Sequence, residues 1–142
     1  MSVSVYLLFD GEMKYSVSKD DLYNFKKLTT VTAIGCESGE EMNWFVSKHD
    51  EQIQSIRITN KSEIPGKKPV IGKWKNTWIQ VPESVTDKHC KGIVDAPEAT
   101  KEDPAVFAWE LSYLLIGAKN EVSIDPGTWT PPPPPDKDPF GP

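Results

Sequence analysis

Four side chains have the types that bind zinc or perform nucleophilic chemistry: Cys36, His49, His89 and Cys90. Zinc needs ligands that converge on one ion, and structural zinc sites show this as closely spaced ligand pairs. That paired spacing is missing here, and the adjacent side chains of His89 and Cys90 do not easily reach the same tetrahedral ion. The sequence therefore predicts no metal site and favours a buried thiol and a loop histidine.

A cysteine nucleophile is the second chemistry that these residues suggest. It needs a base within hydrogen-bond reach, such as His49 or His89, and a nearby acid such as Asp50 or Asp87. No local signature supports that arrangement, and Cys36 ends an apolar segment in which thiols are usually inert. The many acidic residues form no distinctive carboxylate pair, and the glycines do not have the spacing of a phosphate-binding loop. We predict no catalytic residue and no cofactor.

The N-terminal half of the chain carries the clearest structural signals. Apolar residues alternate from Val3 to Val17, and Asp10-Gly11 interrupts them in the manner of a tight hairpin turn. Ser18 and Asp21 resemble a helix cap and predict a short amphipathic helix through Lys27. Further strands are predicted at residues 30–36, 40–48 and 52–59, although the pattern at 40–48 also fits a helix.

The following segment predicts a second hairpin and a loop. Trp74 and Trp78 stand on either side of a turn at Lys75-Asn76. Residues 82–102 are polar and predict a long functional loop or an extended wrap.

The last part of the domain predicts one long helix. Asp103-Pro104 is typical of a helix start, and the residues up to Ala118 are apolar nearly all round, which predicts burial on all sides. An edge strand at 121–124 would close the sheet. The predicted fold class is therefore α+β, a mainly antiparallel sheet built from hairpins and packed on one long apolar C-terminal helix, in a single globular domain of residues 1–124.

Residues 125–142 are predicted to form an extended, proline-rich C-terminal arm. Its five consecutive prolines lack N–H donors and fix φ, so they favour a polyproline II rod of about 15 Å. An aromatic residue stands on each side of this rod, and the two tryptophans of the second hairpin could form another aromatic surface. The predicted partner-binding residues are Trp74, Trp78, Trp129, Pro131, Pro132, Pro133, Pro134, Pro135 and Phe140.

Two short segments of the arm resemble known recognition motifs. Pro131 to Pro135 resembles the proline-rich ligands of profilin, SH3, WW and EVH1 domains, without the flanking phenylalanine or basic residue that some of these domains prefer. Asp138-Pro139-Phe140 is similar to the motif that clathrin-adaptor appendage domains bind. Each resemblance covers only a few residues, and structural clamping of a neighbouring subunit is the interpretation that we favour.

Charge and composition limit the classes of partner. A net charge of −5 over 142 residues argues against nucleic acid, whose binding needs concentrated positive charge. The N-terminus lacks the features of a secretion signal, and no apolar run has membrane-spanning length. Two cysteines are too few for a disulfide framework, although one bridge stays open. A location in the cytoplasm, or incorporation in a virion, fits these features best.

The sequence thus favours a non-enzymatic assembly protein with protein partners, as an oligomer or part of a larger assembly. Its two extended segments, the loop 82–102 and the arm, have the character of structural components of tailed-phage particles. The alternative is an acidic immunity or inhibitor protein that neutralises a toxin or other effector by one-to-one binding through charge complementarity. A small cysteine enzyme is a third class.

Overall fold

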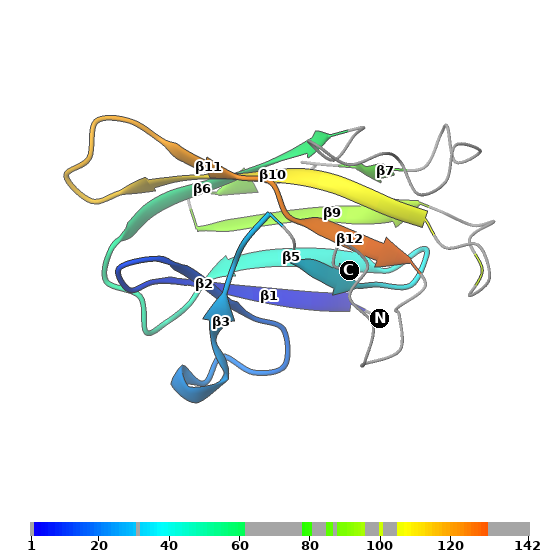
Figure 1. The fold of residues 1–142 in the computed structure, drawn as a ribbon, viewed down its shortest axis with the longest axis horizontal. Helices are drawn as coiled ribbons and strands as arrows, with labels where there is room; N and C mark the ends of the chain where they lie inside the picture. Colours follow the sequence, from blue (N-terminus) through cyan, green and yellow to red (C-terminus); the bar gives the residue numbers. More distant parts are fainter. Residues whose placement is uncertain are drawn as a thin grey trace.

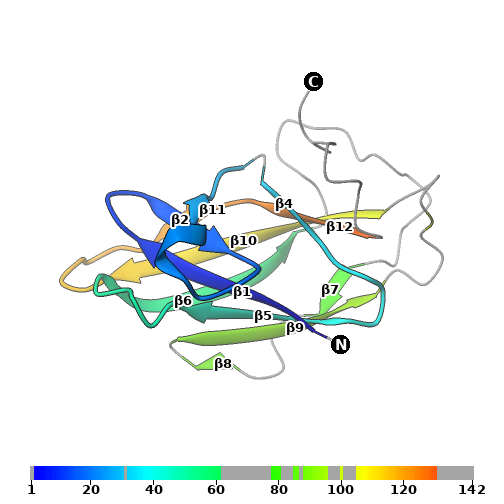
Figure 2. The same cartoon turned by 90° about the horizontal axis from the view of Figure 1, so that it is seen from below.

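The computed structural model describes residues 2–30, 32–61, 78–80, 85–86, 88–95, 100 and 105–130. These residues form two β-sheets that face each other (Figure 1; Figure 2). They contain twelve strands and a 3-10 turn at Leu22–Asn24 (η1). The fold is mostly β, and the described residues contain no helix of seven or more residues.

The first sheet holds the N-terminal strand near its centre. Its strands lie in the order β3, β2, β1, β5, β9 and β7, and β8 also pairs with β9. β1 and β5 are neighbours and run parallel, because the chain visits the second sheet between them. The strands of this sheet are β1 (Ser2–Phe9), β2 (Met13–Ser16), β3 (Lys26–Lys27), β5 (Glu41–Val46), β7 (Trp78–Gln80), β8 (Val85–Thr86) and β9 (His89–Asp95).

The second sheet is organised around β10. One edge of β10 pairs with β6, and the other edge pairs first with β12 and then with β11. The far edge of β12 pairs in parallel with β4. The strands of this sheet are β4 (Ala33–Gly35), β6 (Ile53–Lys61), β10 (Ala105–Leu115), β11 (Val122–Ile124) and β12 (Gly127–Thr130).

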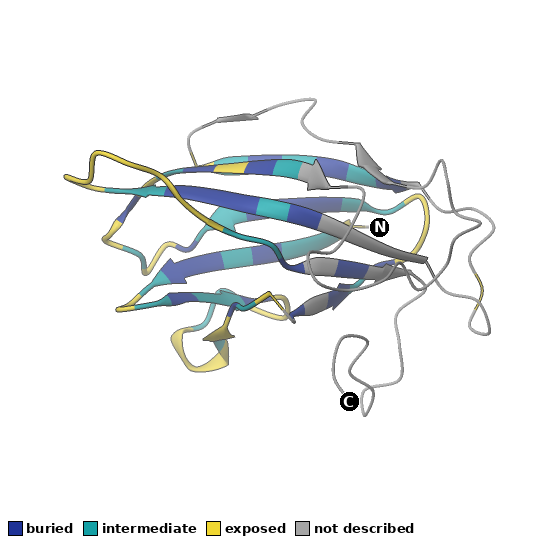
Figure 3. Cartoon of the chain, turned by 45° about the horizontal axis from the view of Figure 1, so that its top comes forward, coloured by how far each residue is buried: buried dark blue, intermediate teal, exposed yellow. Residues whose placement is uncertain are grey.

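The side chains between the two sheets form one hydrophobic core (Figure 3). Trp44 of β5 and Trp109 of β10 are fully buried and meet edge to face, with ring centroids 5.2 Å apart. Such aromatic pairs add about 1 kcal/mol beyond the area that they bury. Nε1 of Trp109 donates to Oγ1 of Thr128 at 2.9 Å, which ties β12 to the core. Trp109 lies in the apolar segment that the sequence predicts to be buried, and its burial is confirmed.

The predicted α+β class is wrong, because the predicted helix from Asp103 to Ala118 is strand β10. Its side chains alternate, with Glu110 partly exposed between inward-facing neighbours. A helix that is apolar all round needs cover on every side, whereas a central strand needs cover on two faces and a hydrogen-bonded neighbour on each edge. β10 has both neighbours, and its buried side chains between the sheets are Trp109, Leu111 and Tyr113.

The short helix predicted from Ser18 to Lys27 is also wrong. The segment contains only η1, followed by β3. Asp21 caps the turn, since its carboxylate accepts the N–H group of Tyr23 at 3.1 Å. Leu22 and Tyr23 face water, with exposed fractions of 55% and 94%, so no apolar stripe is buried that would stabilise a longer helix.

The loop predicted at residues 82–102 contains two strands instead. β8 and β9 lie there, and β9 pairs with β5 on one side and with β7 and β8 on the other. The inward face of β9 carries Cys90, Gly92 and Val94, all buried. Two of these residues are small, so the alternation that marks a strand is weak in the sequence.

The other strand predictions are confirmed where the structure describes them. The Asp10-Gly11 hairpin is β1 and β2, and Gly11 takes a φ of +72°, which glycine adopts without strain. The strands predicted at 30–36, 40–48, 52–59 and 121–124 are β4, β5, β6 and β11. The turn predicted at Lys75-Asn76 lies outside the described residues. Both cysteines are free.

Within the described residues, no helix is long and apolar enough to cross a membrane.

Candidate functional site

The structure separates the four side chains that could have bound zinc. Cys36 and Cys90 are buried in the core. His89 points to the opposite face of β9, where its Nε2 donates to the amide oxygen of Asn43 at 2.8 Å. His49 is exposed, and its Nε2 donates to a backbone carbonyl at 3.1 Å. Among the described residues, no three metal-binding side chains lie together.

The two thiols are held in their neutral form. Burial, together with the nearby carboxylates of Glu40 and Glu37, raises the pKa of the Cys36 thiol to about 12. Burial also raises the pKa of the Cys90 thiol, against the opposing effect of a backbone hydrogen bond. Because the thiolate is the nucleophilic form, neither cysteine is activated for catalysis at neutral pH.

Asp20, Ser47 and His49 lie together and have the residue types of a catalytic triad. The hydroxyl of Ser47 donates to the carboxylate of Asp20, and its oxygen accepts the N–H group of His49 at 3.1 Å. The ring of His49 bonds to the carbonyl oxygen of Asp20 and not to the hydroxyl. In a catalytic triad the imidazole ring is hydrogen-bonded to the hydroxyl that it deprotonates. Because the ring of His49 is not hydrogen-bonded to the hydroxyl of Ser47, this cluster orders a loop and does not form a triad.

Asp50 fixes the end of the molecule where β1, β5 and β6 meet. Its Oδ1 accepts the N–H groups of Gln52 (2.9 Å) and Ile53 (2.6 Å), and its Oδ2 accepts that of Phe9 at 2.7 Å. The carbonyl oxygen of Gln52 in turn accepts the N–H group of Ile116, from the turn after β10. We call this set of linked turns, residues 10–12, 47–52 and 116–121, the pinned end.

Three rings form a ladder on the outer face of the first sheet. Tyr6, Phe45 and His89 are direct cross-strand neighbours on β1, β5 and β9. The rings of Phe45 and His89 stack at 4.4 Å, and those of Tyr6 and Phe45 stack at 5.8 Å. Because these rings stack on one another, they do not present a flat aromatic platform to a ligand.

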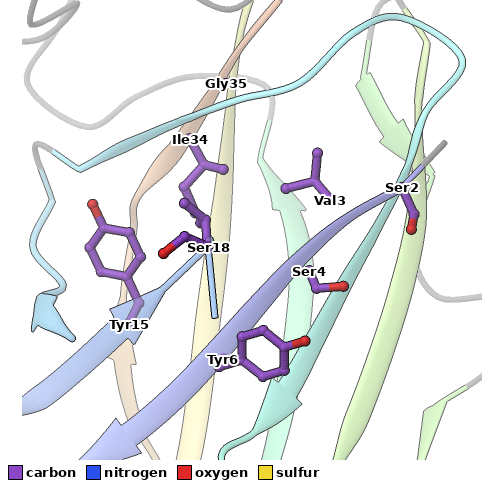
Figure 4. A pocket seen from close by; sticks show the side chains of 9 residues that line it. Ser2, Val3, Ser4, Tyr6, Tyr15, Ser18, Ile34 and Gly35 are labelled. Atoms are coloured by element: carbon purple, nitrogen blue, oxygen red, sulfur yellow. The ribbon is translucent and has the colours of Figure 1, made fainter. Parts of the chain in front are cut away.

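A groove of about 470 Å³ opens where β1, β2 and β4 diverge (Figure 4). β2 pairs with β1 only from Tyr6 to Phe9. The N-terminal half of β1 therefore pairs only with β5 among the described residues. We call this site the groove; the lining residues that matter below are Ser4, Tyr6, Tyr15, Val17, Ile34 and Gly35.

The backbone of β1 also faces the groove. The carbonyl oxygen of Leu7 accepts the N–H group of Ser47, which follows β5, at 2.8 Å. Backbone groups alternate between the two edges of a strand, so the odd-numbered residues of β1 bond toward β5. The backbone groups of the even-numbered residues Ser2 and Ser4 therefore point to the open edge of β1. The groove combines apolar side chains with backbone groups that can still form hydrogen bonds.

Most of the predicted partner-binding residues lie outside the part of the chain that the structure describes. Trp78 and Trp129 have their backbones in β7 and β12. Trp74, Pro131 to Pro135 and Phe140 lie outside the described residues. Thr130 is the last residue of β12, and the part of the arm beyond it lies outside the described residues. The division into a domain of residues 1–124 and an arm from 125 stays a prediction.

The groove was not found by sequence reasoning. Its one local signal is the alternation of serine and tyrosine with valine in β1, which identifies a polar face but not an open edge. Asp50 was considered only as a partner for a cysteine. Its contact with Phe9 spans 41 positions, and no local pattern predicts such a contact.

No protein-family model matches the chain, and no curated protein was found to be related to it. Neither comparison supplies evidence for the expected virion component of tailed phages or for the alternative immunity protein, and the fold is β-rich and not α+β.

Proposed function

We propose that this chain is a non-enzymatic assembly protein that binds a protein partner through its proline-rich C-terminal arm. The supporting observation is the root of the arm. β12 pairs with β10 on one edge and with β4 on the other, and Pro131 follows its last residue directly. An arm that starts from an internal strand has a fixed origin and direction, so it loses less freedom on binding than an arm on a flexible linker.

The composition of the arm suits this role. Five prolines offer carbonyl acceptors and no N–H donors, and the sequence predicts that they favour a polyproline II rod before they bind. Phe140 lies beyond the rod and can serve as an apolar anchor. The partner is expected to be a protein and neither nucleic acid nor a membrane, and the chain is expected in the cytoplasm.

The chemistry of the described residues favours binding over catalysis. The thiols of Cys36 and Cys90 are buried with raised pKa values. The hydroxyl of Ser47 and the ring of His49 are engaged in bonds that order their own loop. The groove remains as the site that can take a ligand, and its lining has no activated nucleophile.

Photo-cross-linking from the arm tests this function. A photoreactive phenylalanine derivative replaces Phe140 in the full chain, in its native cells, and cross-linked products are identified by mass spectrometry. We expect intermolecular cross-links to a specific protein chain. They should disappear in a variant of equal length in which Pro131→Gly, Pro132→Ser, Pro133→Gly, Pro134→Ser and Pro135→Gly remove the rod. Cross-links confined to the chain itself, or unchanged by that variant, would contradict the proposal.

A further inference from the structure

The groove offers the chemistry that a proline-rich segment needs. Proline-rich ligands bind aromatic-lined grooves, where hydroxyl and N–H donors meet their carbonyl oxygens. Tyr15 opposes Leu7 and projects from the inner face of the first sheet, whereas Tyr6 lies on its outer face. Both line the groove at the open edge of β1, and no hydrogen bond to either hydroxyl is found among the described residues. Ser4 adds a backbone N–H group at the open edge of β1. The groove thus supplies hydroxyl and N–H donors, and the proline-rich arm supplies carbonyl acceptors.

The apolar part of the groove is accessible. Val17 is 45% exposed although it is a large aliphatic residue, and it lies beside Tyr15 at the end of β2. Ile34 of β4 also lines the groove but is itself buried (Figure 4). The ring of Tyr6 is already ordered by its stacking on Phe45, so little side-chain freedom is lost when a ligand covers it.

The charges at one end of the groove complement those of the arm. Lys26 of β3 directly opposes Tyr15, and opposed residues project from the same face of a sheet. Among the described residues, no carboxylate lies within ion-pair distance of Lys26. Asp136 and Asp138 follow the proline run directly. A proline segment in the groove can thus place its acidic flank beside this lysine, in a chain whose overall charge is −5.

The arm begins beside its own groove, because Trp129 pairs with Gly35 of the groove lining, and β12 points past that residue. Trp129 pairs with Gly35 in parallel, so the chain leaves β12 in the direction in which β4 ends. Thr130 precedes a proline and is therefore restricted to extended conformations, which excludes a tight reversal at that point. Five prolines then extend for about 15 Å. In the polyproline II conformation that the sequence predicts, a segment of this length would carry the acidic flank past the chain's own groove.

We propose that the groove binds Pro131 to Pro135 of a second copy of this chain, with Asp136 and Asp138 of that copy beside Lys26. This inference rests on the proposed function and names its partner. If two copies exchange their arms, the contact closes a dimer; if each arm binds the next copy, larger assemblies form. In both cases the proline run of one copy fills the groove of another.

Complementation between two defective full chains tests the exchange. The arm variant carries the five proline replacements given above, and the groove variant carries Val17→Asp, which places a charge where the prolines would pack. Val122→Asp is the matched control, because Val122 is 48% exposed on β11 and does not line the groove. Molar mass is measured by light scattering after gel filtration.

We expect the unaltered chain and the Val122→Asp control to form dimers or larger assemblies. Each defective variant alone should have the mass of one chain. An equimolar mixture should form dimers, since the intact arm of the groove variant can fill the intact groove of the arm variant. A mixture that stays monomeric, or a Val17→Asp variant that assembles like the control, would overturn the inference.

The ionic contact has a separate test. Lys26→Glu should weaken self-assembly at least tenfold, and combining it with Asp136→Lys and Asp138→Lys should restore it. If the combined variant does not regain self-assembly, Lys26 does not contact the two aspartates. A monomeric unaltered chain would overturn the second-copy proposal, whereas the proposed function stands if photo-cross-linking then finds a different protein. Absence of any intermolecular cross-link would instead overturn the proposed function itself.

Discussion

The two halves of β1 have very different surroundings. From Tyr6 to Phe9 the strand pairs with β2 on one edge and β5 on the other, and it runs into the pinned end. From Ser2 to Val5 it pairs, among the described residues, with β5 alone and borders the groove. One strand therefore supplies both a fixed structural half and an open half that is available for binding. Strand edges that are left open are where another chain can add hydrogen bonds.

The largest expected effect lies at the pinned end. Asp50→Ala removes the acceptor for three backbone N–H groups, those of Phe9, Gln52 and Ile53. Hydrogen bonds to a charged acceptor are stronger than neutral ones, so we expect a loss of about 3 kcal/mol in the free energy of unfolding. Urea denaturation measures it.

Asp10→Ala is the control, because its ion pair with Lys14 is long and exposed and should contribute less than about 0.5 kcal/mol. If both variants lose equally little stability, the pinned end is not fixed by Asp50, and the contrast between the two halves of β1 disappears.

Amide hydrogen exchange compares the two halves directly. The N–H groups of Ser4 and Leu8 both point away from β5, but only Leu8 has β2 beside it. We expect the amide of Ser4 to exchange about 100-fold faster than that of Leu8, since an unpaired amide needs no opening of the sheet. NMR at low protein concentration measures both rates. Equal protection would show that the edge at Ser4 is not open in solution.

The smallest effect concerns pH on the groove side, where Cys36 follows β4. Its thiol has a pKa near 9 when unfolded and about 12 when folded. The folded state thus retains a proton that the unfolded state loses between these values. The stabilisation from the neutral thiol is complete below pH 9 and decreases as the pH rises toward 12, by at most about 1.4 kcal/mol per pH unit.

Cys36→Ala should reduce this alkaline decrease, and urea denaturation from pH 8 to 11 compares the two slopes. Both proteins keep Cys90, Tyr15 and Tyr113, whose pKa values are also raised by burial. Identical slopes would mean that the Cys36 thiol is not shielded from water.

Local patterns predicted the strands and turns whose signals are local. The Asp10-Gly11 turn is determined by its own two residues, and the apolar alternation of β5 and β6 is visible within their own sequences. β10 was predicted as a helix for two reasons. Its buried residues Trp109, Leu111 and Tyr113 alternate with residues that are also partly apolar, and Asp103-Pro104 resembles a helix cap. The choice between helix and strand was decided by β6 on one edge and β11 and β12 on the other. Those neighbours are not local to β10.

The groove could not be predicted from local sequence patterns either, because it also depends on strand pairing between distant parts of the chain. Tyr15, Val17 and Ile34 line one groove because β2 separates from β1 there and β4 belongs to the other sheet. No sequence pattern specifies where two paired strands separate. The arm was predictable because five prolines determine their own conformation. The surface that receives it depends on long-range pairing.

The position of β12 also affects when the protein can finish folding. It is the last described strand to be synthesised, and it joins β4 to β10 in the second sheet. β4 therefore waits through nearly a hundred residues of synthesis for its hydrogen-bonded neighbour. A premature stop before residue 127 would leave β4 without β12 and would leave one edge of β10 unpaired from Ala105 to Ala108, exposing strand edges that favour aggregation.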